Sequence, residues 1–162
     1  MHFSQDIAAT YRGPGKVVRR LLAAGPREDR ALAILMGACC ILFIARWPAL
    51  ARQAHLDGVE LNMLLGGTLM ATIFLAPLLF YAIAYVAHLI ARVARGKGPS
   101  YNARLSLFWS LLASSPLILL NGLVAGFIGP GLELTIVGVL WFAVFMWFWL
   151  ASMVAVYREG DA

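Results

Sequence analysis

Residues 114–131 read SSPLILLNGLVAGFIGPG, a stretch in which helix-breaking residues interrupt an apolar run. It holds two prolines, four glycines, two serines and one asparagine, and the rest are Leu, Ile, Val, Ala and Phe. How such a segment folds depends on the solvent around it, because hydrocarbon cannot satisfy an exposed backbone polar group and water can. The composition of the whole chain therefore has to be considered first.

The composition indicates a membrane protein. Apolar residues make up 62% of the 162 residues, charged residues make up 13%, and the mean hydropathy is +0.81. Soluble domains are about 45–50% apolar and about 25% charged. The net charge of +5 could suggest nucleic acid. However, the basic residues flank apolar runs and are not interleaved with aromatic residues, which favours a cytoplasmic bias of Lys and Arg and excludes a nucleic-acid partner.

Four runs without charge predict an all-α, polytopic fold with four transmembrane helices, since one span needs about 20 apolar residues. The first run is short, and the snorkelling side chains of Arg30 and Arg46 lengthen it. The second is long enough for one tilted helix with Pro77 near its middle. The third and fourth are joined by a tight hairpin at 129–131. The predicted spans are 31–47, 62–91, 105–127 and 134–157.

The distribution of Lys and Arg predicts the orientation of these spans. Six lie in residues 1–30, four in the connection 92–104 and one in the tail 158–162, whereas the opposite side holds Arg46 and Arg52. Eleven against two places both termini in the cytoplasm. We therefore expect a multi-pass protein of the bacterial cytoplasmic (inner) membrane, with a basic N-terminal segment, a four-span domain at 31–157 and a short cytoplasmic tail.

Two connecting segments carry local predictions. In residues 1–30, apolar residues recur at helical spacing beside basic ones, which predicts either an interfacial helix on the anionic leaflet or a solvated basic tail. Gly25 is expected to end that helix and Pro26 to begin the next. Pro48 is expected to begin a short helix beyond the first span. The apolar positions are Val17, Val18, Leu21 and Leu22.

Small and weakly polar residues follow one face of the third span. Serines recur every four residues, Asn121 continues their face, and Gly122 and Gly126 form a small-xxx-small pair beside it. An interface between helices is preferred here over a substrate path. Pro77 and Pro116 predict kinks, and Ser114 or Ser115 is expected to satisfy a carbonyl that Pro116 frees. The serines are Ser106, Ser110 and Ser114.

No constellation for catalysis is recognised in the sequence. The three histidines are distributed over both predicted sides of the membrane, and no metalloprotease, P-loop or nucleophile-elbow motif is present. No charged residue is predicted deep in a span, where proton-coupled transporters usually place one. We therefore expect a protein that is not an enzyme and binds no cofactor or metal.

Residues 86–127 resemble the Yip domain family of membrane proteins, first known as partners of Ypt/Rab GTPases. An apolar helix ends in His88-Leu-Ile-Ala-Arg92, a Gly-Lys-Gly loop follows, then an aromatic residue, and a Ser-Pro pair lies further along at Ser115 and Pro116. The resemblance implies a polytopic protein of the bacterial branch with a cytoplasmic N-terminus and no catalytic residues. The loop and aromatic residue are Gly96, Lys97, Gly98 and Tyr101.

The chain departs from that family in two ways. Many members look like five-span proteins, and four spans are counted here. The long cytosolic N-terminal region of the eukaryotic relatives is missing, so their role with GTPases is not carried over. The leading hypothesis is a scaffold or accessory subunit that packs against lipid, other membrane proteins or itself. The alternative is a small channel or facilitator whose path follows Ser106, Ser110, Ser114, Asn121 and the Pro77 kink.

Overall fold

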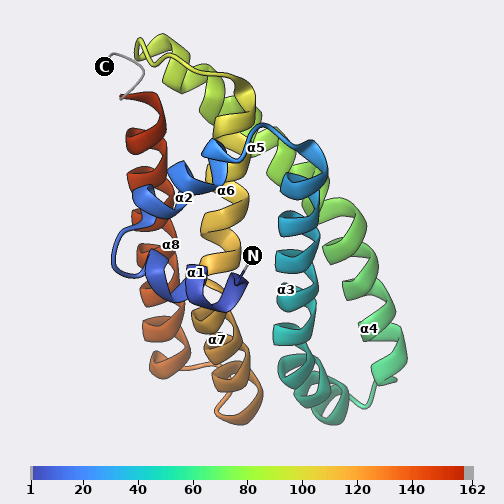
Figure 1. Ribbon diagram of the computed structural model, residues 1–162. Coiled ribbons are helices and arrows are strands. Elements are labelled where there is room, and N and C mark those ends of the chain that lie inside the picture. Colours follow the sequence, from blue (N-terminus) through green and yellow to red (C-terminus); the bar gives the residue numbers. More distant parts are fainter. Residues whose placement is uncertain (1, 159–162) are drawn as a thin grey trace.

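The computed structural model describes residues 2–158, and this part of the chain is all-helical (Figure 1). The predicted tail lies outside the described residues except for Arg158. In chain order the helices are α1 (Phe3–Thr10), α2 (Pro14–Ala23), α3 (Glu28–Asp57), α4 (Leu61–Met70), a π-helical turn (Ala71–Leu75), α5 (Ala76–Val93), α6 (Ser100–Ala113), α7 (Ser115–Phe127) and α8 (Leu132–Tyr157).

Three helical segments are long and apolar enough to cross a membrane. They are α3, the continuous segment Leu61–Val93 and α8. A fourth span is present if α6 and α7 count as one, although they are bent by 47° at their junction. The all-α fold is thereby confirmed, and it contains three to four candidate membrane spans.

The third span is built around α6, the most deeply buried helix. Eleven of its 14 residues are buried, including every residue from Leu105 to Ala113. The surrounding helices α2, α3, α5 and α8 all pack on it, and Figure 1 shows α6 between α8 and α3. A helix that faces protein on every side does not need the apolar stripe of a surface helix, because no side of it contacts solvent.

Both internal prolines mark irregular backbone, as predicted. Pro116 lies in the first turn of α7, and Pro77 lies in the first turn of α5 behind the π-helical turn. Pro116 is tolerated because its missing N–H would have no intrahelical partner at the start of a helix. Pro77 lies inside the continuous segment Leu61–Val93, where the preceding π-helical turn accommodates it. The predicted serine contact is not made, because Ser114 Oγ donates to the carbonyl of Leu111 over 2.9 Å and not to that of Leu112, four residues before Pro116.

The first span differs from its prediction. The helix does not end near Trp47, and Pro48 does not begin a new one, because α3 runs unbroken to Asp57 with Pro48 inside it. A proline inside a membrane helix is tolerated where a neighbouring helix covers it. Here α7 does so, with Gly126 directly against Pro48. Gly58, at φ 64°, ends the helix in the left-handed conformation.

The basic N-terminal segment also differs from both of its predicted forms. It folds into α1 and α2, and the apolar face of α2 is buried on α6 and α8, not on lipid or in water. Val18 is completely buried, and a Cβ added to Gly15 would lie 2.7 Å from that of Ala155. Gly25 ends the segment at φ 91°, but the next helix begins at Glu28, not at Pro26.

Contacts of α1 fix the N-terminal segment along the bundle. The indole Nε1 of Trp109 donates a hydrogen bond to Thr10 Oγ1 over 3.0 Å. The ring of Tyr11 lies edge-on to that of Phe148, with 4.9 Å between their centroids. Because Trp109 and Phe148 belong to α6 and α8, the N-terminal helices form part of the same core.

Candidate functional site

The three serines of the predicted polar face are enclosed by protein. Ser106, Ser110 and Ser114 are completely buried. Ser110 Oγ donates to the carbonyl of Ser106 over 2.7 Å, and Ser114 Oγ accepts a hydrogen bond from Trp141 Nε1 over 3.2 Å. Among the residues that the structure describes, Ser106 Oγ has no hydrogen-bond partner. Ser114 therefore links α6 to α8, Ser110 bonds within α6, and none of the three lines an open path.

Asn121 is separated from these serines by the bend between α6 and α7. Seven residues beyond Ser114, it was expected to continue their face, which would hold for a straight helix. With the helices inclined at 47°, Asn121 is instead half-buried at the rim of a different cavity. Within residues 2–158 its side chain makes no hydrogen bond, so the amide can still bind a ligand.

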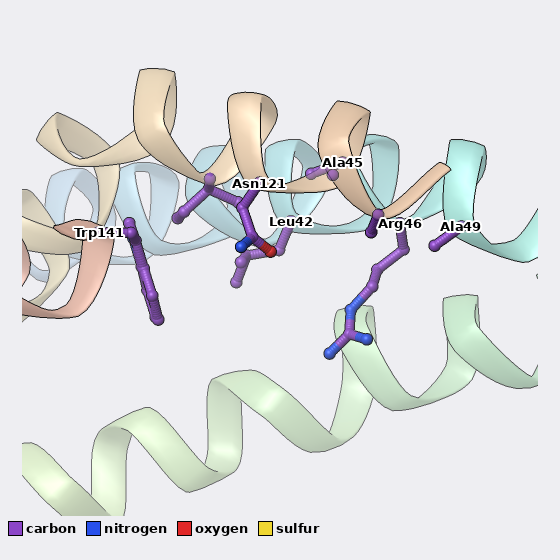
Figure 2. A pocket seen from close by; sticks show the side chains of 9 residues that line it. Leu42, Ala45, Arg46, Ala49, Asn121 and Trp141 are labelled. Atoms are coloured by element: carbon purple, nitrogen blue, oxygen red, sulfur yellow. The ribbon is translucent and has the colours of Figure 1, made fainter. Parts of the chain in front are cut away.

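The cavity beside Asn121 has a volume of about 190 Å³ and is the candidate site. Three helices line it, and Figure 2 shows the amide of Asn121 and the guanidinium of Arg46 projecting from the α3–α7 layer on the same side. The rest of the lining is apolar or small. The residues are Leu42, Ala45, Arg46 and Ala49 of α3, Ile118, Asn121, Gly122 and Ala125 of α7, and Trp141 of α8.

Arg46 is the charged group of this cavity, and its position in the fold differs from the one predicted from the sequence. It was expected at the end of a span, but α3 continues past it to Asp57. In the described part of the chain, no ion pair of Arg46 is found. A guanidinium has five N–H donors, and an amide adds donors and an acceptor. Together they suit an oxyanion such as a carboxylate or phosphate, and the lining contains no second ionisable residue for acid–base chemistry.

The glycine pair of α7 lies in the contact with α3 that forms one wall of the cavity. A Cβ added to Gly122 would lie 1.9 Å from the carbonyl oxygen of Ala45. A Cβ added to Gly126 would lie 2.2 Å from the Cβ atom of Pro48. Small residues allow backbones to approach closely where lipid gives helices no hydrophobic reason to associate. The two glycines therefore set the distance between α3 and α7.

Three of the residues that carry the Yip resemblance, His88, Gly96 and Gly98, lie at the opposite end of the bundle beside Tyr157. His88 Nδ1 and Tyr157 Oη are 2.7 Å apart and join α5 to α8. A Cβ added to Gly96 would lie 2.9 Å from Tyr157 Cδ1, and Gly98 has φ 148° beside the side chain of Asn102. The loop is thus a tightly packed connection between α5 and α6.

The remaining residues of that segment reach the N-terminal helices or the surface. Tyr101 Oη donates a hydrogen bond to the carbonyl of Arg27 over 3.1 Å, and Arg104 forms an ion pair with Glu28. Arg92 and Lys97 are exposed. Tyr157 is the last residue of α8. Its contact with His88 joins residues 69 positions apart, so no local sequence pattern predicts it.

Comparisons of the chain with protein-family models, curated proteins and solved structures find no match. The Yip resemblance therefore stays a prediction. Among residues 2–158, the structure also brings no three His, Cys, Asp or Glu side chains together as a metal site.

Replacing Gly122 with Ala should destabilise the bundle, because the added methyl meets backbone that cannot move aside. We expect the free energy of unfolding in mild detergent to fall by roughly 1–3 kcal/mol, the usual cost of overpacking. Gly37→Ala is the matched control, since nothing lies within 4 Å of a Cβ there. That control should be neutral or slightly stabilising. Equal effects of both substitutions would contradict the assigned role of Gly122.

Proposed function

We propose that the chain is a non-enzymatic integral membrane protein that serves as a scaffold or accessory subunit and docks to another membrane protein through α4 and α5. The proposal rests on how little of the segment Leu61–Val93 is covered by the rest of the chain. Only 11% of the residues in its most apolar stretch are buried. Figure 1 shows α4 on the side of α3 away from α8.

Exposure alone would fit lipid, but α4 also presents unfilled small residues. No atom lies within 4 Å of a Cβ added to Gly66 or Gly67, whereas Gly122 and Gly126 are filled by α3. Thr68 and Ala71 extend the same small, weakly polar stretch. Small residues in membrane helices commonly serve close helix packing. Small residues thus already pack α7 on α3, whereas Gly66 and Gly67 of α4 have no helix of the described chain packed against them.

The finer aspects of the proposal rest on the sequence. The excess of Lys and Arg supports a bacterial inner-membrane protein with both termini in the cytoplasm. The resemblance to the Yip domain family supports the same orientation. The docking partner is another membrane protein or a second copy of this chain, because the open glycines lie within an apolar span.

In-membrane photocrosslinking tests the docking face. A photoreactive residue at Met63 or Met70, both exposed on the face of α4, should yield a protein adduct of defined mass. The same probe at Phe142 of α8 should yield mainly lipid adducts. Replacing Gly67 with Leu should lower the protein adduct roughly tenfold, the effect of about 1.4 kcal/mol, whereas Gly37→Leu should not. A lone monomer in mild detergent, with no adduct in native membranes, would refute the proposal.

A second candidate function, a small facilitator for anions, is favoured by one observation. Arg46 and Asn121 share a cavity and have no partner for their polar groups within the described residues. Arg46 is exposed and lies well inside the length of α3, and a charged residue on a membrane span commonly marks a substrate path. The serines do not contribute to it, because the cavity lining contains none of them.

Anion flux into liposomes tests this second candidate. If the cavity conducts, Arg46→Gln should lower the flux about tenfold, the effect of losing one charge-assisted contact. Asn121→Ala should also lower it. Ser110→Ala, a buried change outside the cavity, should leave the flux unchanged. No flux above that of empty liposomes, or equal flux through all variants, would eliminate this function.

A further inference from the structure

A larger cavity lies between the C-terminal halves of α5 and α8, far along the chain from the Arg46 site. Its volume is about 650 Å³. Both helices pack on α6, which keeps them apart. The wall from α5 is made mostly of alanines, together with the exposed Ile90, and the wall from α8 is made of larger apolar side chains. These are Ala87, Ala91 and Ala94, and Leu150, Met153 and Val154. We call this space the α5–α8 groove.

One end of the groove is cationic. Arg95 and Arg158 line that end, and both residues are exposed. Within residues 2–158 neither forms an ion pair, and the lining of the groove contains no acidic residue. The other end is lined by apolar residues of α5 and α8 that belong to membrane spans. The groove therefore joins a positive end to an apolar stretch along the outside of two membrane spans.

The geometry of this end is fixed by the neighbouring backbone. Arg95 has φ 65°, a left-handed conformation, and the next residue, Gly96, packs on the ring of Tyr157. Tyr157 directly precedes Arg158, so this contact brings the two arginine positions together. The hydrogen bond between His88 and Tyr157 ties α5 to α8 beside them. A site whose walls are already joined needs little ordering before it binds a ligand.

Size and charge select the occupant. The volume falls in the range of about 300–1,000 Å³ typical of sites for small molecules. From Ala87 to Ala94 the groove is roughly 10 Å long at 1.5 Å per residue, which is too short to hold several turns of a partner helix. An elongated apolar ligand with a negative head fits both ends. Basic pockets between membrane helices are known binding sites for anionic lipid headgroups.

We propose that the α5–α8 groove binds one anionic phospholipid, with an acyl chain between α5 and α8 and the phosphate at Arg95 and Arg158. Tyr157 and Trp149, which also line the groove, are aromatic residues of the kind enriched at the membrane interface. Alanine rather than a larger residue at 87, 91 and 94 keeps the space open. The bound lipid would complete the surface of the bundle between these two spans.

Native mass spectrometry and thermal unfolding of the full-length protein test the proposal. After delipidation, phosphatidylglycerol added in mild detergent should bind with one molecule per chain and raise the melting temperature, and phosphatidylcholine should do neither. The double variant Arg95→Asn with Arg158→Gln should bind phosphatidylglycerol roughly tenfold to thirtyfold more weakly, given two lost basic contacts. Asparagine is chosen at 95 because it tolerates the left-handed conformation.

A second variant and two controls separate this site from general attraction. Ala91→Phe keeps every charge but fills the groove, and it should also abolish the single binding event. Ala82→Phe, exposed on α5 outside the groove, should not. Arg12→Gln with Lys16→Gln removes two positive charges from α1–α2 and their linker, and should leave binding within twofold.

Three results would overturn the proposal. One is equal binding of phosphatidylcholine. Another is that the Arg12 and Lys16 double variant weakens phosphatidylglycerol binding as much as the Arg95 and Arg158 double variant does. The third is stabilisation by glycerol phosphate alone, which would assign the arginines to a soluble anion.

Discussion

The enclosure of α6 by protein on every side is the constraint on which the rest of the bundle depends. The indole of Trp109 carries a donor that hydrocarbon cannot satisfy, so another helix must supply its acceptor, and the serines of α6 are buried beside it. The N-terminal helices α1 and α2 supply part of that cover, and α3, α5 and α8 supply the rest. The basic N-terminal segment is therefore structural, because Thr10 accepts the hydrogen bond of the indole.

The bend after α6 determines which residues share the cavity beside Asn121. α7 leaves the axis of α6 at 47° and lies on α3, where two glycines permit backbone contact. This inclination removes Asn121 from the serine face and places it in the same cavity as Arg46. At the other end of the bundle, α5 and α8 are held apart by α6, and the alanines of α5 leave a groove there. Both cavities thus follow from how the third span is built.

Much of the architecture could be predicted from sequence because it is local. Runs without charge mark the spans, Pro116 marks the break in the third, and Gly129, at φ 88°, lies in the predicted hairpin. The small-xxx-small pair correctly indicated close packing of α7, although its partner α3 could not be read from it. Each of these features depends on neighbouring residues or on the solvent.

The features that the sequence could not predict depend on distant partners. Pro48 favours a helix start by its own chemistry, but α7 covers it and α3 continues through it. Val17 and Val18 have the spacing of an interfacial helix, and only the presence of α6 and α8 shows that protein covers them. Arg46 could not be placed within a cavity while α3 was expected to end beside it. The pairing of His88 with Tyr157 also has no local signature.

Lipid accessibility along α6 tests the central claim most directly. Single nitroxide labels at successive positions from Leu105 to Ala113, in reconstituted membranes, report contact with oxygen dissolved in the bilayer. The account predicts uniformly low accessibility at all nine positions, with high values at Val139 and Leu140 of α8, which are exposed. Accessibility that rises and falls along α6 with the 3.6-residue period of a helix would show one face toward lipid, and would contradict the account.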